Sequence, residues 1–149
     1  MPTRAQVAAG LRPHRMRGMT LIELMVVVAI VAILSTLAVG SYRRYVLRAN
    51  RTDATSALLR IQVAEEKYFL QNNAYTTDVT DLPPAGLGVA SPTPKGFYNL
   101  SVTGAPIATS FQATATATST QTQDTSCQTL TIDDQGLRNS APSTTECWR

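Results

Sequence analysis

The sequence predicts an α+β fold in which one long N-terminal helix packs on a small antiparallel β-sheet head. Two observations lead to this prediction. An apolar run near the N-terminus continues into a segment where apolar residues recur every three or four positions, which is typical of an amphipathic helix. Further along, three short segments alternate apolar and polar residues between turn residues, which is typical of antiparallel strands.

The chain combines unlike segments rather than one uniform soluble core. It has 149 residues, 44% of them hydrophobic and 15% charged, which is enough for one domain and an anchor. Apolar residues are concentrated in the first third, whereas residues 108–126 are mostly Thr, Ser, Gln and Ala. The average hydropathy therefore describes neither part.

The net charge of +3 does not indicate a nucleic-acid-binding surface, because the basic residues are unevenly distributed. Residues 1–18 contain four arginines and no acidic residue: Arg4, Arg12, Arg15 and Arg17. From Met19 onward the chain has nine basic and ten acidic residues, and from Gln71 onward it has three basic and six acidic residues. The C-terminal part is acidic and is not expected to form the basic groove that phosphate contacts require.

An apolar run extends from Met19 to Gly40 with few polar interruptions. As a helix it would be about 33 Å long, enough to span a bilayer. A secretory signal peptide has a shorter apolar stretch followed by a small-residue cleavage motif. The apolar run of this chain is too long and lacks that motif, so it is not typical of a secretory signal peptide. We expect residues 19–40 to form a hydrophobic transmembrane helix.

Glu23 lies inside this apolar run. A carboxylate there costs about 2.5–3.5 kcal/mol at mid-bilayer and less near the interface. One interpretation is a glutamate at the membrane edge, and the other is a carboxylate that pairs with a cation.

Residues 41–72 are predicted to continue the helix in amphipathic form. The stripe expected to face a sheet comprises Ala54, Ala57, Leu58, Ile61, Ala64 and Tyr68. The opposite face, expected to be solvated or to contact a neighbouring subunit, carries Arg48, Arg51, Arg60 and Glu66. Four arginines could also contact anionic lipid headgroups: Arg43, Arg44, Arg48 and Arg51. Asn72-Asn73 is expected to end the helix, because asparagine tolerates a left-handed cap.

Residues 73–149 are predicted to form the β-sheet head. Irregular chain is expected at the proline-rich residues 83–86 and 91–94. Strands are expected at residues 97–103, 111–117 and 127–132. The side chains expected to share one face in each strand are Tyr98, Leu100 and Val102; Phe111, Ala113, Ala115 and Ala117; and Gln128, Leu130 and Ile132. Turns are expected at residues 104–106 and 133–136.

The two cysteines of the chain, Cys127 and Cys147, lie in the head. If the head is exported they meet an oxidising compartment, so we predict one disulfide that closes the loop 127–147. The alternative is two free or metal-binding thiols. A zinc site would lack further ligands, because the single histidine, His14, precedes the apolar run.

Residues 17–30, RGMTLIELMVVVAI, closely resemble the processing site and helix start of type IV prepilins. This resemblance implies a type IV pilin fold and cleavage between Gly18 and Met19 by prepilin peptidase, which would remove residues 1–18 as a leader peptide. It also implies N-methylation of Met19, where the family usually has phenylalanine. Glu23 matches the glutamate that the family has at the fifth position of the mature chain.

The physical logic of this start does not depend on the family. Cleavage creates an α-ammonium group at Met19 in the same apolar region as the Glu23 carboxylate. Pairing Glu23 of one subunit with the Met19 ammonium of its neighbour would relieve two desolvation penalties at once and could set the register of assembly.

The head extends the resemblance to the PilE-like minor pilins. The residues that carry it are Glu65, Tyr68, Tyr75, Phe97-Tyr98, residues 123–127, residues 130–132, Gly136 and Cys147-Trp148. The resemblance implies a minor pilin that supports type IV pilus assembly, twitching motility and adhesion. It implies a precursor in the inner membrane with a periplasmic head, then a surface fibre. The implied partners are other pilins, prepilin peptidase, the inner-membrane assembly platform and membrane lipid.

Two other functions stay open at this point. One is a pseudopilin of type II secretion, and the other is a DNA-binding minor pilin for DNA uptake, although the acidic head makes nucleic acid an unexpected partner. An enzyme, a cofactor or a small-molecule substrate is not expected, because His14 lies in the leader. Calcium at Asp124, Asp133 and Asp134 is not expected either, because the spacing is not that of an EF-hand and residues 133–136 are typical of a turn.

Overall fold

The computed structural model describes residues 18–104, 109–144 and 146–148. It divides into two compact units, Met1–Ala38 and Val39–Arg149, which are described separately below. The leader arginines and His14 lie outside the described residues, as does most of the turn expected at residues 104–106.

Helix α1 spans Leu21–Asn72. It ends where the sequence predicts, because Asn73 adopts a left-handed conformation with φ of 54°. The Asn73 amide donates to the Phe69 carbonyl oxygen at 2.7 Å, and the Asn72 side chain donates to the Tyr68 carbonyl oxygen at 3.1 Å. These bonds satisfy carbonyl groups that the end of a helix leaves without intrahelical partners.

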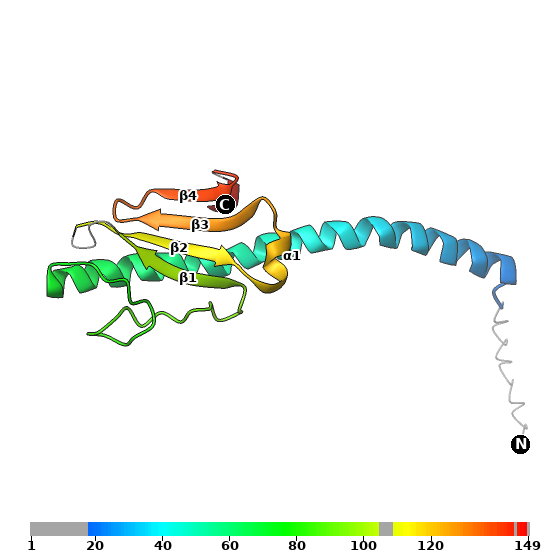
Figure 1. Ribbon diagram of the computed structural model, residues 1–149. Helices are drawn as coiled ribbons and strands as arrows, with labels where there is room; N and C mark the ends of the chain where they lie inside the picture. Colours follow the sequence, from blue (N-terminus) through cyan, green and yellow to red (C-terminus); the bar gives the residue numbers. More distant parts are fainter. Residues whose placement is uncertain (1–17, 105–108, 145, 149) are drawn as a thin grey trace, which may run out of the picture. The chain divides into compact units, whose positions relative to one another are not determined.

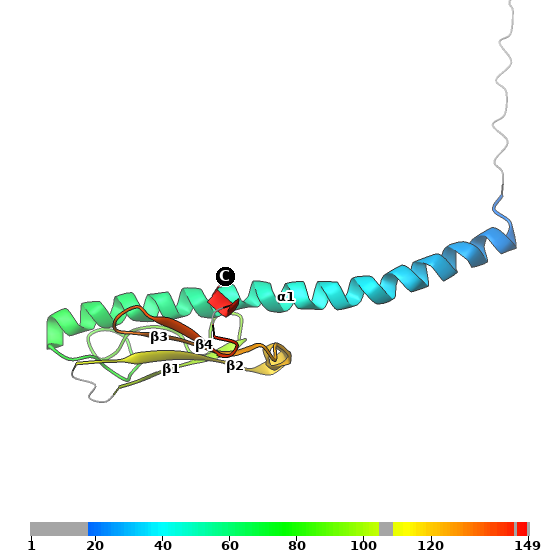
Figure 2. The same cartoon turned by 90° about the horizontal axis from the view of Figure 1, so that it is seen from above.

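Over the described residues, the head contains one antiparallel sheet with the strand order β1-β2-β3-β4. The strands are β1 (Tyr98–Thr103), β2 (Gln112–Ala117), β3 (Cys127–Asp133) and β4 (Arg138–Pro142). Each strand pairs with the next along the chain, and the sheet lies along the second half of α1 (Figures 1 and 2). Two short 3-10 helices, Ser119–Gln123 and Glu146–Trp148, precede β3 and follow β4.

The core lies between α1 and the sheet. The helix contributes Ala54, Ala57, Leu58 and Ile61, which are at most 5% exposed. The sheet contributes Tyr98, Leu100, Val102, Ala113, Ala115, Leu130 and Ile132. Small alanines on both layers allow the helix backbone to approach the sheet closely, so the predicted stripe of α1 and the predicted faces of the first two strands are confirmed.

The structure corrects the expectation for the last part of the sheet. Strand β4 was not predicted, because its sequence, RNSAP, has neither a run of β-branched residues nor clear alternation. Gln128 was expected to share a face with Leu130 and Ile132, but it is exposed, and Cys127 is buried instead. The pairing of β3 with β4 shifts register between Cys127 and Thr129, and this irregularity moves Gln128 to the outside.

The C-terminal segment is fixed to the sheet by a covalent bond and by Trp148. Cys127 and Cys147 form a disulfide with Cα atoms 5.6 Å apart, as the sequence predicts. The Trp148 indole donates to the Asn139 carbonyl oxygen at 2.8 Å, and the Arg138 guanidinium lies 5.3 Å from the centre of the Trp148 ring. These contacts cover part of the open edge of β4.

The loop between α1 and β1 covers the opposite edge of the sheet. Ser91 Oγ accepts from the Leu100 amide at 2.8 Å and donates to the Leu100 carbonyl oxygen at 3.1 Å. The Thr93 amide donates to the Tyr98 carbonyl oxygen at 2.8 Å. Gly86 is required within this loop, since a Cβ atom there would lie 2.7 Å from the Asp81 carbonyl oxygen.

Candidate assembly interface

The first part of α1 begins with a cap formed by its own sequence. The Glu23 amide donates to Thr20 Oγ1 at 3.3 Å, and the Leu24 amide donates to the Thr20 carbonyl oxygen at 3.1 Å. Threonine followed three residues later by glutamate is the sequence pattern of a capping box. Glu23 also lies in the first turn, where the helix dipole favours a negative charge.

Gly18 and Met19 precede this cap in exposed, non-helical chain. A Cβ atom at Gly18 would meet no atom within 4 Å, and Met19 is 59% exposed. The peptide bond between them is therefore open to a protease in the structure of this unit.

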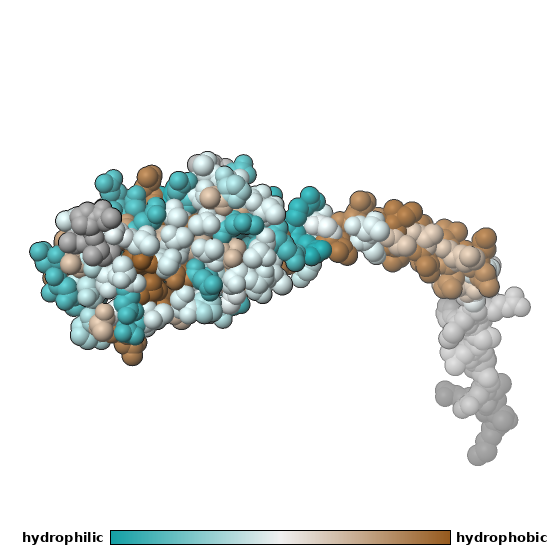
Figure 3. All heavy atoms as spheres, in the orientation of Figure 1, coloured by the Kyte–Doolittle hydropathy of each residue, from teal (hydrophilic) through white to brown (hydrophobic). Residues whose placement is uncertain are grey.

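The apolar side chains of residues 19–39 have no cover within their own unit. The large hydrophobic side chains from Met19 to Val39 are 46–76% exposed, and Figure 3 shows them as a nearly continuous hydrophobic surface. Burying one such side chain is worth about 1.5–3 kcal/mol. Over the described residues, α1 is the helix that is long and apolar enough to cross a membrane, so this surface requires lipid or other helices as its environment.

The polar residues within the apolar run differ in how they are satisfied. Ser35 Oγ donates to the Val31 carbonyl oxygen and Thr36 Oγ1 to the Ile33 carbonyl oxygen, each at 2.7 Å. These hydroxyls therefore need no partner outside the helix. Among residues 18–38, by contrast, no cation contacts the carboxylate of Glu23.

In the other unit, a polar network joins α1 to the segment before β3. Arg51 forms two hydrogen bonds with the Asp124 carboxylate, at 2.7 Å and 2.9 Å. Gln121 accepts from Asn50 at 3.1 Å and donates to the Leu47 carbonyl oxygen at 3.1 Å and to Asp124 at 3.2 Å. The Asp124 hydrogen bond raises the pKa of Arg51 above its usual value, so Arg51 remains a fixed cation.

This network corrects the expectation that Arg51 is solvated. The sequence also did not predict which residues form the network. Arg48 and Arg60 are exposed as expected. Asp124, the partner of Arg51, and Gln121, which bonds to Asp124, lie in the Ser/Thr-rich region. Both are buried, and nothing in the local sequence pattern marks them as buried. Asp124, one of the three aspartates considered above for calcium, is the ion-pair partner of Arg51.

The disulfide is the part of the predicted site that the structure confirms. The roles of Gly18, Met19 and Glu23 depend on a protease and a second subunit, so they remain predictions. Among the described residues no cluster of three or more His, Cys, Asp or Glu side chains could hold a metal ion.

Two protein-family models match the chain. Residues 13–39 match the prokaryotic N-terminal methylation motif. Residues 40–131 match the family described as type IV minor pilin ComP, DNA uptake sequence receptor, which is more than half of the chain. The chain belongs to the type IV pilin family.

Known pilins support this membership. The chain is 36% identical over 62 residues to the type IV major pilin protein PilA of Myxococcus xanthus, covering 42% of this chain and 28% of that protein. It is 36% identical over 87 residues to the type IV major pilin protein PilE1 of Neisseria gonorrhoeae, covering 58% and 39%. The match thus spans less than half of the length of these relatives.

A secretion protein and a solved structure are also similar to this pilin. The type II secretion system core protein G of Pectobacterium carotovorum is 36% identical over 70 residues, covering 47% of this chain and 45% of that protein. The structure of a type IV pilin from Shewanella oneidensis matches with a TM-score of 0.50 and 27% identity, covering 69% of this chain and 98% of that one. The fold of the head is therefore the type IV pilin fold.

Proposed function

We propose that this pilin is a minor structural subunit of a type IV pilus that supports pilus assembly, twitching motility and adhesion. The observation that carries the proposal is the apolar surface of residues 19–39, which has no cover in its own unit and contains one acidic residue, Glu23. Such a surface is stable in a bilayer or among other apolar helices. A fibre subunit needs both environments, first as a precursor and then as part of the fibre core.

The proposed maturation begins with prepilin peptidase, which cuts between Gly18 and Met19. The exposed chain at this bond and the match to the methylation motif support this step. Cleavage leaves Met19 as the first residue, and its new amino group is methylated. The head then faces the periplasm while residues 19–40 remain in the inner membrane.

The proposed assembly step pairs charges between subunits. The Glu23 carboxylate of the incoming subunit pairs with the ammonium group of Met19 of its neighbour, because residues 18–38 contain no basic side chain that could neutralise it. Two charges that are each costly in an apolar environment are more stable together than apart. The partners in this scheme are other pilins, prepilin peptidase, the inner-membrane assembly platform and lipid, and the chain acts as a structural protein without catalysis.

Two experiments test this proposal: detection of the chain in surface fibres, and deletion of its gene. An immunoblot of fibres sheared from the cell surface should detect the head, and deletion of the gene should reduce surface fibres and twitching. Complementation with the full chain should restore both. Absence of the chain from sheared fibres, together with normal twitching in the deletion strain, would contradict the proposal.

The structural alternative is a pseudopilin, and the similarity to a type II secretion core protein is the observation in its favour. The disulfide and the Trp148 contact close the C-terminal end of the head, and together with the Ser/Thr-rich region they favour the pilus. Affinity purification separates the two, since a pilus subunit should recover the pilus platform protein and a pseudopilin should recover the secretion platform protein.

DNA uptake is a second candidate function because the matched family is described as a DNA uptake sequence receptor. The charges of the head do not support it. Lys95 and Arg138 are the basic residues that the structure describes beyond Gln71, and Arg138 lies over the Trp148 ring. Nonspecific DNA binding requires several phosphate contacts and weakens steeply with salt.

A binding titration of the full chain in detergent with labelled duplex DNA tests this candidate. We expect no measurable binding at physiological salt. A micromolar complex that weakens as salt increases would establish DNA binding and overturn the expectation.

A further inference from the structure

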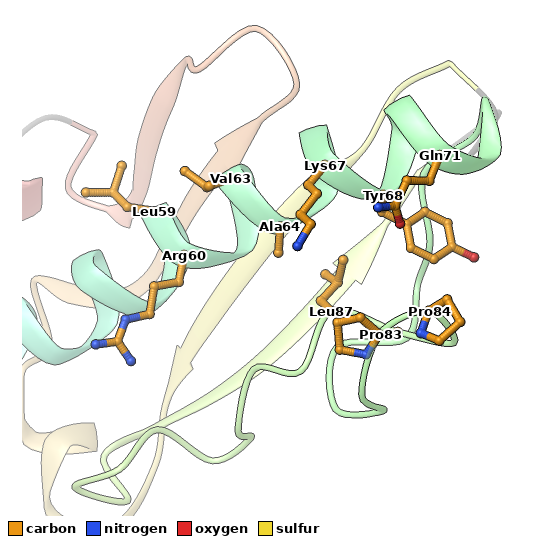
Figure 4. Close-up of a pocket in the computed structure, with 11 residues that line it drawn as sticks. Leu59, Arg60, Val63, Ala64, Lys67, Tyr68, Gln71, Pro83, Pro84 and Leu87 are labelled. Atoms are coloured by element: carbon orange, nitrogen blue, oxygen red, sulfur yellow. The ribbon is translucent and has the colours of Figure 1, made fainter.

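A groove on the head lies between α1 and the loop that contains Pro83 and Pro84. It has a volume of about 510 Å³, within the range of about 300–1,000 Å³ that is typical of small-molecule sites. Its walls are mainly apolar, with Val63 and Ala64 on the helix and Leu87 on the loop (Figure 4). The groove therefore has the size and the lining of a ligand site.

The apolar side chains of the groove differ in depth. Leu87 is 6% exposed and lies deepest, whereas Leu59 is 38% and Val63 71% exposed. The rim is thus an apolar surface in contact with water. An occupant that covers it gains free energy if the occupant is itself apolar along its length.

The loop wall is held in place by its own backbone. The Leu87 amide donates to the Asp78 carbonyl oxygen at 3.0 Å, and the Val89 amide donates to the Val79 carbonyl oxygen at 2.8 Å. Since the wall is formed without an occupant, binding costs little ordering entropy.

The charges along the groove have one sign. Arg60 and Lys67 line it, both are exposed, and its lining contains no acidic residue. Two acidic residues of the same elements are bound elsewhere. The Glu66 carboxylate accepts from the Tyr75 hydroxyl at 3.4 Å, and the Asp78 carboxylate accepts from two amides of its own loop at 2.9 Å and 3.1 Å. A complementary occupant therefore carries a negative charge.

The groove is long and narrow. Its helix side runs from Leu59 to Gln71, about 18 Å along the axis, and a single loop forms the other side. Arg60 lies near one end, and Lys67 lies about 10 Å further along the helix. This shape suits one extended chain with its charged group at the Arg60 end.

We propose that the groove binds a single-chain amphiphile with an anionic head, of the class of long-chain fatty acids. The Arg60 guanidinium binds the carboxylate, for which its planar fork is suited. The alkyl chain lies over Ala64 and Leu87 towards Tyr68, and the apolar stem of Lys67 covers it. The inference goes beyond the proposed fibre role and does not depend on it, because the site lies entirely within the head.

Photolabelling of the full chain in nanodiscs of phosphatidylcholine tests this site. The probe is dodecanoic acid with a diazirine near its methyl end, and mass spectrometry locates the label. We expect label in residues 59–71 and 83–87. Residues 19–39 should also be labelled by probe dissolved in the bilayer, which provides an internal reference. Unlabelled dodecanoate should compete in the groove and butyrate should not, because each buried methylene strengthens binding by up to about fourfold.

The methyl ester of the probe isolates the contribution of the charge. It should label residues 19–39 like the acid and label the groove about fivefold less, as expected for loss of exposed charge pairs. The double variant Arg60→Gln with Lys67→Gln should lower groove labelling by the acid to the level of the ester. The same variant should leave labelling by the ester unchanged.

Val63→Asp isolates the contribution of the apolar wall. Because Val63 is mostly exposed, the variant should fold, and it should lose groove labelling by both probes since it places a carboxylate in the wall. Leu137→Asp is the matched control, because it makes the same replacement at a side chain that is 68% exposed outside the groove. It should label like the wild-type chain.

Each result supports or overturns the proposal. Equal groove labelling by the acid and the ester would overturn an anionic ligand. Absence of groove labelling by the acid, or equal labelling in Val63→Asp, would overturn an amphiphile site and would indicate a protein segment as the occupant. Because the experiment uses the isolated chain, absence of the chain from sheared fibres would contradict the fibre role and leave these results unaffected.

Discussion

Glu65 is a carboxyl group in an apolar environment at the end of α1. Its side chain is fully buried. One oxygen accepts from the Thr76 amide at 3.1 Å, and the other has no hydrogen-bond partner among the described residues. The pKa of Glu65 is raised to about 7, mainly by burial; the Thr76 hydrogen bond opposes the shift and the nearby Glu66 charge adds to it.

This raised pKa predicts that the head is more stable in mild acid. In the unfolded chain Glu65 has a pKa near 4.5, so between pH 4.5 and 7 the folded head holds a proton that the unfolded chain has lost. Each unit by which the two pKa values differ is worth about 1.4 kcal/mol, so the free energy of unfolding should fall by about 3 kcal/mol as the pH rises through this range, and change little from this group above it. Urea unfolding of the full chain in detergent at several pH values measures the effect.

Two variants isolate Glu65 as the cause. Glu65→Gln keeps an acceptor for Thr76 and should remove most of this pH dependence. Glu66→Gln, a change at the exposed neighbour, should retain it. If the wild-type chain and Glu65→Gln lose stability equally between pH 5 and 8, the pH dependence has another origin.

Glu23 is the second residue whose environment predicts an effect. If its carboxylate pairs with the Met19 ammonium group of a neighbour, Glu23→Ala leaves that cation without a partner in an apolar environment. We expect the variant to insert into the membrane at the wild-type level and to be lost from sheared fibres. Quantitative immunoblots of membranes and fibres measure both quantities.

Ser35→Ala is the matched control for this prediction. It also removes a polar group from the apolar run, but the Ser35 hydroxyl bonds to its own helix. It should therefore enter fibres normally. Wild-type incorporation of Glu23→Ala would refute the pairing, and equal loss of both variants would indicate a general requirement for polar groups.

At the scale of elements, the sequence predicts whatever depends on a regular pattern. The helix from Leu21 to Asn72, its asparagine end and the first two strands all follow from periodicity and cap residues. The exposed position of Gln128 could not be predicted in this way, because a register shift in the β3–β4 pairing interrupts the alternation. Strand β4 could not be predicted either, because its pairing with β3 stabilises it and its own residues have little preference for a strand.

The same limit applies to the assembly site. Residues 17–23 indicate the cleavage and pairing groups through their resemblance to prepilins, which is a property of one short segment. The Arg51–Asp124 pair joins residues that are far apart along the chain. Neither segment carries a signal of its partner, so contacts of this kind emerge only from the fold.

The disulfide links β3 to the C-terminal 3-10 helix and so fixes an element with little core of its own. It joins residues 20 apart in sequence, and closing a loop of this length should stabilise the head by roughly 3 kcal/mol. In the double variant Cys127→Ser with Cys147→Ser, the free energy of unfolding should be lower by this amount, so the variant should unfold at a lower urea concentration. A reductant should lower the stability of the wild-type chain in the same way and have no effect on the variant, and unchanged stability of the variant would show that the bond is dispensable.

At the scale of the whole molecule, the chain consists of two units with different environments. The head buries its apolar residues between α1 and the sheet, so it is stable in water. Residues 19–39 keep their apolar side chains exposed, so they require lipid or other subunits. This difference between the units matches the proposed function, in which the chain is first held in a membrane and later becomes part of a fibre.

The most direct test of this role is mass spectrometry of the chain's N-terminus in sheared fibres and in membranes from the same cells. The proposed function predicts a chain that begins at Met19 with a methylated amino group and is present in the fibre fraction. A processed chain found in membranes alone would indicate a pseudopilin or a role limited to assembly. A chain that begins at Met1 in both fractions would contradict processing at Gly18 and, with it, the proposed role as a pilus subunit.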